Sequence, residues 1–113
     1  MTPARLRRGA GKFGNVQTAA RGKVFASKRE AVRYGELSAL ASAGVIKRLE
    51  TQVKWELVPR QGKERAVNYV SDFQYFDAED RLHVEDTKGY KTREYVIKRK
   101  LMRWVHGVVI EEI

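Results

Sequence analysis

Two apolar runs, residues 69–76 and 82–88, are separated by the short polar segment 77–81, and this pattern most restricts the fold of the chain. Apolar runs that flank a turn predict a β-hairpin. If the turn is centred on Glu79, residues whose numbers add up to 158 face each other, so Asp72 is expected opposite Asp86. Directly opposed Cβ atoms lie roughly 5 Å apart, and like charges there destabilise the pair unless another group compensates them. The hairpin therefore predicts a site that requires positive charge.

Lys88 follows Asp86 by two residues, so the alternation of side chains along a strand places both on one face. A divalent cation would compensate the two carboxylates, and Mg²⁺ prefers oxygen ligands. We expect Asp72 and Asp86 to bind Mg²⁺ with the backbone carbonyl of Thr87, while Lys88 orients or helps to deprotonate a water molecule. These groups are what phosphodiester hydrolysis requires. An isolated Asp-x-Lys sequence is usually a surface ion pair, so this interpretation depends on the second carboxylate opposite the first.

A helix is expected over residues 27–43, with Gly44 as its stop signal. Ser27 and Glu30 match a capping box, in which Glu30 folds back onto the Ser27 amide. Glu30 also lies at the end of the apolar face of this helix, where a charge needs a partner. Glu30 is therefore both a predicted cap and a candidate metal or catalytic residue.

The remaining elements follow from alternation and from helical spacing. Strands are expected at residues 53–58, 66–76 and 82–88. Thr92 can cap a helix that runs to His106 and ends at Gly107, with a core stripe formed by Ile97, Leu101, Trp104 and Val105. A last strand is expected at residues 108–110, joining the sheet beside an existing strand through a crossover. The predicted fold is a single α/β domain of order αβββαβ, with a mixed sheet flanked by helices.

The chain is strongly basic, with 23 Lys and Arg residues against 14 Asp and Glu residues among 113, and this balance points to a polyanion as partner. Residues 1–29 hold no acidic residue, and we interpret residues 1–22 as a flexible basic arm that precedes a domain over residues 23–113. A solvated tail without a partner is the alternative. The expected DNA-binding residues are Arg5, Arg7, Arg8, Lys12, Lys28, Arg29, Lys91, Arg93, Lys98 and Arg99.

The sequence argues against several other classes of protein. No apolar stretch approaches the roughly 18 residues of a membrane-spanning helix, and the N-terminal residues lack the apolar region of a secretory signal. The absence of cysteine excludes disulfides, thiolate zinc sites and cysteine nucleophiles.

His83 and His106 are expected to be structural, and Tyr69, Phe73 and Tyr75 are expected in the core, with a base-stacking platform as the alternative. These features favour a cytoplasmic protein.

Asp72, the segment Val84-Glu85-Asp86-Thr87-Lys88 and the helical Glu30 together resemble the PD-(D/E)XK nuclease superfamily. The surrounding sequence, from about residue 12 onward, more specifically resembles a group of small phage and prophage proteins related to Holliday-junction resolvases. The resemblance implies a restriction-endonuclease-like core and Mg²⁺-dependent endonuclease activity, with Mn²⁺ as a substitute. It also implies a homodimer that acts on branched or double-stranded DNA in the host cytoplasm. Glu30, Asp72, Asp86 and Lys88 would occupy the acidic and lysine positions of the family.

Two residues depart from the nominal motif. Ser71 replaces its proline, and Asp86 stands where Glu is commoner. Gln52 also matches the family pattern, although no role follows from it. Three alternatives remain open: a phage endonuclease that acts on flaps or nicks, a non-catalytic nucleic-acid-binding module, and a small basic protein associated with RNA.

Overall fold

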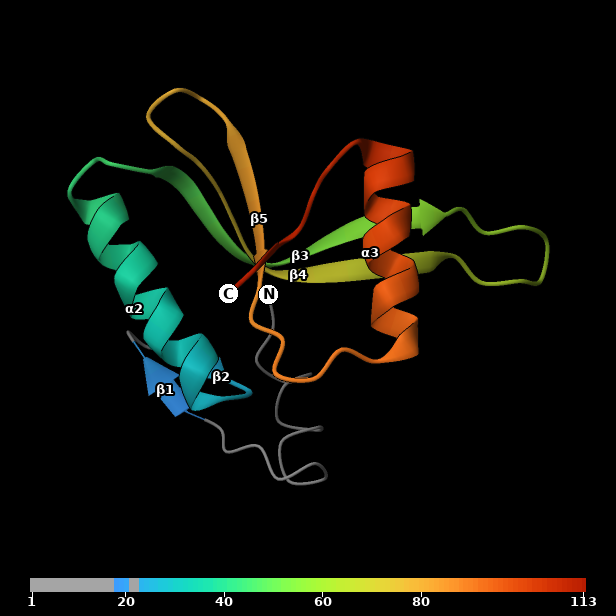
Figure 1. The fold of residues 1–113 in the computed structure, drawn as a ribbon, viewed down its shortest axis with the longest axis horizontal. Coiled ribbons are helices and arrows are strands. Elements are labelled where there is room, and N and C mark those ends of the chain that lie inside the picture. Colours follow the sequence, from blue (N-terminus) through green and yellow to red (C-terminus); the bar gives the residue numbers. More distant parts are fainter. Residues whose placement is uncertain (1–17, 21–22) are drawn as a thin grey trace. The chain divides into compact units, whose positions relative to one another are not determined.

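The structure is a computed structural model that describes residues 18–20 and 23–113 (Figure 1). Its elements are β1 (Thr18–Ala20), β2 (Lys23–Phe25), α2 (Lys28–Ser42), β3 (Lys47–Val58), β4 (Val67–Phe76), β5 (Leu82–Asp86), α3 (Arg93–His106) and β6 (Glu111–Glu112). From α2 onward the order is αβββαβ, which confirms the predicted α/β fold. Most of the arm predicted over residues 1–22, including Arg5, Arg7, Arg8 and Lys12, lies outside the described residues.

The chain divides into two compact units. The first contains the described residues up to Leu49 together with Tyr75–Arg81, and the second contains Glu50–Gln74 and Leu82–Ile113. The chain passes from one unit to the other within β3, within β4 and at the start of β5. No helix in the described part of the chain is long and apolar enough to cross a membrane.

The first unit is built around α2. The Ser27 hydroxyl accepts a hydrogen bond from the Glu30 amide at 3.2 Å, which satisfies one of the free amides at the start of the helix, as the predicted cap requires. Leu37 is fully buried, and the rings of Phe25 and Tyr34 lie 5.1 Å apart. An antiparallel hairpin of β1 and β2 precedes the helix. This hairpin was not predicted.

The turn between β4 and β5 also belongs to the first unit. The Asp77 amide donates to the Arg81 carbonyl at 2.9 Å, so the turn is centred on Glu79 as predicted. The Asp77 side chain accepts from the Glu79 and Arg81 amides at 2.8 and 3.0 Å. Asp80 adopts a left-handed conformation with φ of 62°, which an aspartate tolerates at such a position.

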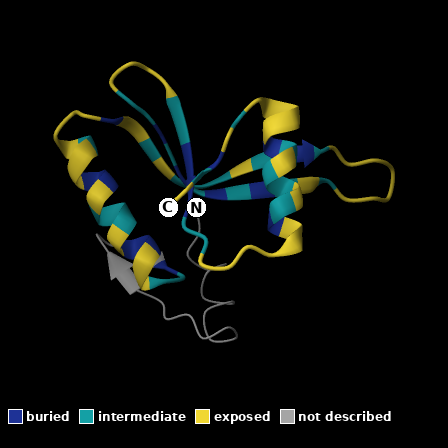
Figure 2. Cartoon of the chain, in the orientation of Figure 1, coloured by how far each residue is buried: buried dark blue, intermediate teal, exposed yellow. Residues whose placement is uncertain are grey.

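The four-stranded sheet has the order β3-β4-β5-β6. β5 and β6 are parallel, with Glu85 opposite Glu111 and Asp86 opposite Glu112. Because a parallel pair needs a crossover, α3 connects the two strands, as the sequence predicts. Along β4 the residues alternate between buried and half-buried, and Tyr69, Ser71 and Phe73 are on the buried side (Figure 2).

The core of the second unit lies between the sheet and α3. Its buried members are Leu57, Tyr69, Val84, Tyr95, Met102 and Ile110. α3 begins at Thr92, whose hydroxyl accepts from the Tyr95 amide at 3.1 Å, and ends at Gly107 in a left-handed conformation with φ of 69°. Both ends of this helix were predicted, because Thr and Gly are typical of these two positions.

Three predictions about these elements are wrong. The core side of α3 is formed by Tyr95 and Met102 with Leu101 packed against the core, so Leu101 alone of the predicted stripe is confirmed, whereas Ile97, Val105 and Trp104 are 53%, 46% and 86% exposed. The last strand is Glu111–Glu112 and not residues 108–110, because the Val108 amide still caps α3 through the Met102 carbonyl. The first strand of the sheet starts at Lys47, six residues before the predicted start.

The aromatic residues of β4 are buried, as expected of core residues. Tyr69, Phe73 and Tyr75 are exposed by 3%, 0% and 7%. This burial rules out the alternative that they form a base-stacking platform on the surface.

Candidate active site

The carboxyl groups of Asp72 and Asp86 meet within the second unit. Asp72 lies in β4 and is half-buried, whereas Asp86 ends β5 and is 2% exposed. The charge of Asp72 raises the pKa of Asp86, and the amide of Thr87, the residue after Asp86, donates to Asp72 Oδ2 at 2.7 Å, so the two carboxyl groups lie near each other. Two neighbouring carboxyl groups disfavour each other's charged form, so the pair calls for a proton or a cation.

Asp86 ionises less readily than an ordinary carboxyl group. Burial raises the pKa of Asp86 from 3.8 to about 7, and the charge of Asp72 acts in the same direction. The hydrogen bond from Tyr69 and the charge of Lys88 lower this pKa but do not offset burial. Near neutral pH Asp86 therefore exchanges between its neutral and its charged form.

Tyr69 fixes the orientation of Asp86. Its hydroxyl donates to Asp86 Oδ2 at 2.6 Å from within the core. Burial and the charge of Asp86 raise the pKa of Tyr69, so the phenol stays protonated and acts as a donor. Asp86 Oδ1 is the oxygen that faces Lys88.

Asp72 is held by the residue that follows Asp86. The amide and the hydroxyl of Thr87 both donate to Asp72 Oδ2, at 2.7 and 2.8 Å. From the sequence, Thr87 was expected to contribute only its carbonyl to a metal. The observed contacts instead fix the orientation of the Asp72 carboxyl group.

Lys88 lies beside the pair. Its ammonium nitrogen is 3.8 Å from Asp86 Oδ1 and 5.0 Å from the centroid of the Tyr95 ring. The Tyr95 ring face attracts the ammonium group and restricts its position. Asp72, Asp86 and Lys88, which were predicted on one face, thus come together.

Glu112 is a third acidic residue near this group. β6 aligns it with Asp86, and its Oε2 atom accepts from the Tyr95 hydroxyl at 2.7 Å and from Arg99 at 2.9 Å. Its other oxygen lies 3.8 Å from Lys91 Nζ. The hydrogen bond from Tyr95 lowers the pKa of Glu112, so its charge is already compensated by protein groups. Glu112 therefore anchors Tyr95 to β6.

The residues present fit a divalent cation of the hard, oxygen-preferring kind. The pair lacks a full positive counter-charge, and a cation would replace the proton on Asp86. Within the described residues no group of three or more His, Cys, Asp or Glu side chains could hold a metal ion. The two carboxylates of Asp72 and Asp86 alone still suit Mg²⁺, because this ion is commonly bound through one or two carboxylates and keeps several water ligands.

The other predicted metal residue, Glu30, belongs to the first unit. It is buried at the start of α2, with 4% exposure, as its place on the apolar face predicted. Asp72, Asp86 and Lys88 belong to the second unit. A role of Glu30 in the same site therefore stays a prediction.

The predicted DNA-binding residues differ in their surroundings. Lys91 and Arg99 pair with Glu112, and Lys98 pairs with Glu94 at 3.1 Å. Arg93 on α3 is exposed. Lys28 and Arg29 at the start of α2 are not buried either.

The two histidines have structural contacts. His83 Nδ1 lies 2.6 Å from Glu111 Oε2, and His106 Nε2 lies 2.6 Å from the Glu56 carbonyl oxygen. The His106 ring also meets the Trp55 ring edge-on at 5.0 Å. These contacts agree with the structural roles that were expected from the sequence.

A model of one protein family matches residues 10–109, which is most of the chain. The chain belongs to the DUF1064 family. That family is described only as a protein of unknown function. No curated protein and no solved structure matches the chain. Membership of DUF1064 therefore assigns no activity, and the resemblance to PD-(D/E)XK nucleases stays a prediction.

Tyr69, Tyr95 and Glu112 were not predicted as neighbours of the site. Tyr69 was assigned to the core, where its ring indeed lies, but alternation along a strand does not show where a phenol hydroxyl ends. Tyr95 and Glu112 contact each other only because β6 returns beside β5. Gln52, for which no role was predicted, lies in β3 with φ of 56°.

Proposed function

We propose that this protein is a Mg²⁺-dependent DNA endonuclease that hydrolyses phosphodiester bonds. The observation that carries the proposal is that Thr87 ties Asp72 to the end of β5, where Asp86 lies beside Lys88, with the pKa of Asp86 raised to about 7. Raised pKa values of this kind are common where carboxylates serve catalysis.

Each residue has a distinct role in the proposed reaction. Asp72 and Asp86 would hold a divalent cation, which when bound would lower the pKa of a water molecule and compensate charge on the phosphate. Tyr69 keeps Asp86 Oδ2 in a fixed orientation. Lys88 offsets the negative charge that develops on the phosphate as the bond to water forms and the bond to the leaving oxygen breaks. Tyr95 keeps the Lys88 ammonium in place.

The substrate is proposed to be branched DNA, with the four-way junction first among the candidates, cut by a homodimer in the cytoplasm. The formal net charge of +9 supports a polyanionic substrate of some kind. The preference for a junction rests on the sequence resemblance to phage resolvases alone. Flapped or nicked DNA is the alternative substrate.

The test is cleavage of end-labelled substrates by the full chain with Mg²⁺, and with EDTA as the control. A four-way junction, a flap, a nicked duplex and a matched linear duplex are compared at one salt concentration. Faster cutting of the junction supports the proposal, and equal cutting of all substrates removes the junction preference. Binding of DNA with no cutting in Mg²⁺ or Mn²⁺ would identify a non-catalytic binding module.

A further inference from the structure

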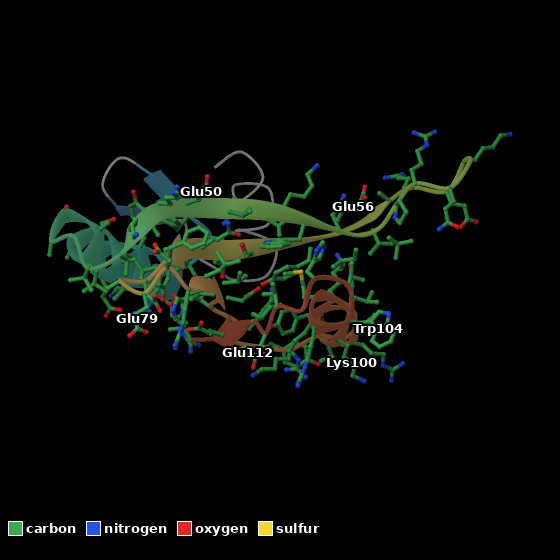
Figure 3. All side chains as sticks on the ribbon, turned by 90° about the horizontal axis from the view of Figure 1, so that it is seen from above. Glu50, Glu56, Glu79, Lys100, Trp104 and Glu112 are labelled. Atoms are coloured by element: carbon green, nitrogen blue, oxygen red, sulfur yellow. The ribbon has the colours of Figure 1, made fainter. Side chains whose placement is uncertain are left out.

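The side of α3 that faces away from the core carries a regular stripe of basic and apolar residues. Arg93, Ile97, Lys100 and Trp104 follow at spacings of four, three and four, so they lie on one face of the helix. The buried residues Tyr95 and Met102 lie on the opposite face. In Figure 3 the side chains of Lys100 and Trp104 project from α3 on its outer side. We call these four residues, with the adjacent Arg103, the outer face of α3.

The apolar members of the outer face are unusually exposed. Trp104 is 86% exposed and Ile97 is 53% exposed. Trp55, the other tryptophan of the chain, is half-buried and packs against the core and His106. A large aromatic ring left in water on a folded helix commonly marks an interaction surface.

The charges of the outer face indicate the kind of partner. Glu94 is the only acidic residue in α3, and its carboxylate pairs with Lys98, which lies outside the outer face. Arg93, Lys100 and Arg103 have no acidic partner within ion-pair distance among the described residues. A second copy of the chain would bring these like charges together, whereas a polyanion would compensate them.

A nucleic acid with unpaired bases combines the two properties that this surface calls for. Bases stack on exposed aromatic side chains, and phosphates bind Lys and Arg. Lys100 and Trp104 are about 6 Å apart along the helix axis, from a rise of 1.5 Å per residue. This distance allows one nucleotide to contact both. Bases inside a continuous duplex are already stacked on each other and do not offer a free face.

We propose that the outer face of α3 binds single-stranded or unpaired nucleic acid, with a base stacked on Trp104 and phosphates on Arg93, Lys100 and Arg103. This inference extends the proposed function, because it names the part of the substrate that the protein holds. The binding itself does not require cleavage. The two ideas can therefore fail separately.

Binding is measured with the Asp86→Asn variant in EDTA, so that cleavage plays no part. The probes are a thymidine oligonucleotide and a blunt duplex of equal length. The oligonucleotide is expected to quench tryptophan fluorescence and to lose affinity by roughly 5- to 150-fold on Trp104→Ala, the range for one base–aromatic stack. Trp104→Phe should keep most of the affinity, because a stacking ring remains.

Val32→Ala is the matched control, because Val32 is also an exposed apolar residue on a helix, at 54% exposure, but lies on α2. It should leave the affinity unchanged. Unchanged affinity of Trp104→Ala for the oligonucleotide would overturn the inference. A second result would also overturn it. If sedimentation shows that Trp104→Ala converts a dimer into a monomer while the affinity for the oligonucleotide stays the same, the outer face of α3 is a contact between two copies of the chain. Trp104-dependent binding by a protein that never cuts DNA would leave this inference intact and remove the nuclease.

Discussion

Asp86 is buried next to a second carboxyl group, and both features favour its neutral form. Its side chain is 3% exposed, and its oxygens contact Tyr69 and lie near Lys88. A carboxyl group in this position costs stability when it ionises, unless a cation takes the place of its proton. This cost is a measurable consequence of the site, independent of any activity.

The stability of the metal-free protein should therefore depend on pH through Asp86. The folded pKa of Asp86, about 7, lies above the unfolded value of 3.8, so the folded state binds the extra proton. The free energy of unfolding should contain a contribution that is present below about pH 4 and is lost as pH rises to about 7. Asp86→Asn removes this dependence and should be more stable than the wild type at pH 8 by roughly 2–4 kcal/mol.

Urea unfolding at pH 4, 6 and 8 checks this prediction. Glu64→Gln is the control, because Glu64 is exposed in the loop before β4 and has no ion pair among the described residues. Its pH dependence should follow that of the wild type. If the wild type were more stable than Asp86→Asn at pH 8, the ionisation of Asp86 would not destabilise the folded state, and the prediction would be wrong.

Tyr69 should control the pH dependence of cleavage. Its hydrogen bond lowers the pKa of Asp86, so Tyr69→Phe should raise that pKa above about 7. If cleavage requires ionised Asp86, the acidic limb of the rate profile moves to higher pH, and the rate at pH 7 falls roughly tenfold for each pH unit by which the pKa rises. The loss should be recovered at higher pH. Tyr90→Phe serves as control, since Tyr90 is 80% exposed, and a loss that is equal at every pH would argue against this role.

At the level of residues, the acidic pair and the lysine could be predicted from the sequence, because the centre of a hairpin turn determines which residues of the two strands face each other. The turn from Asp77 to Arg81 is as predicted, and Asp72 lies near Asp86, because the amide of Thr87 donates to it. The donors that orient these carboxylates could not be predicted. Tyr69 and Thr87 reach them through side-chain directions that follow from packing and not from alternation.

The secondary-structure elements follow mainly from their ends. Ser27 and Thr92 begin the two helices through side-chain oxygens, and Gly107 ends α3 because its φ of 69° suits a residue without a Cβ atom. Inside α2, Gly35 has no such conformational need. The two glycines should therefore respond in opposite ways to substitution by alanine.

Substitution of these two glycines tests the assigned helix positions. A Cβ atom at Gly35 would meet nothing within 4 Å, so Gly35→Ala should stabilise the protein by about 0.5–1 kcal/mol through helix propensity. Gly107→Ala also meets no atoms but must keep its positive φ, which costs about 1–2 kcal/mol. Urea unfolding measures both changes. Stabilisation by Gly107→Ala would contradict the assigned end of α3.

The faces of the elements were harder to predict than their ends. α3 has apolar residues on more than one side, and the predicted core stripe of Ile97, Leu101, Trp104 and Val105 includes only Leu101 of those that pack on the core. Tyr95 and Met102 are buried instead, because the sheet packs on their side. The β1–β2 hairpin and the true start of β3 also depend on partners that one segment does not reveal.

For the whole molecule, the formal net charge of +9 predicts DNA binding that weakens with salt. Part of the predicted basic surface is already paired within the protein. Lys98 contacts Glu94, and Lys91 and Arg99 contact Glu112. The exposed charges on the outer face of α3 should therefore contribute more to DNA binding than these paired ones.

Two nearby lysines of α3 should differ in their effect on DNA binding. Lys100→Ala should weaken binding and reduce the slope of log affinity against log salt by about one, as expected for one lost phosphate contact. Lys98→Ala is the matched control and should change the slope less, because its charge is shared with Glu94. Equal slopes for both variants and the wild type would mean that the DNA does not contact this helix.

Single-turnover cleavage of a labelled four-way junction, bound to the protein in advance and started by adding Mg²⁺, decides whether the acidic pair is an active site. We predict that the wild type cuts the junction. Asp86→Asn should bind the junction at least as tightly, because a negative charge is lost, and should cut it at least about a hundredfold more slowly. Equal cutting rates for the two proteins, or no cutting by the wild type in Mg²⁺ or Mn²⁺ despite binding, would contradict the proposed nuclease site.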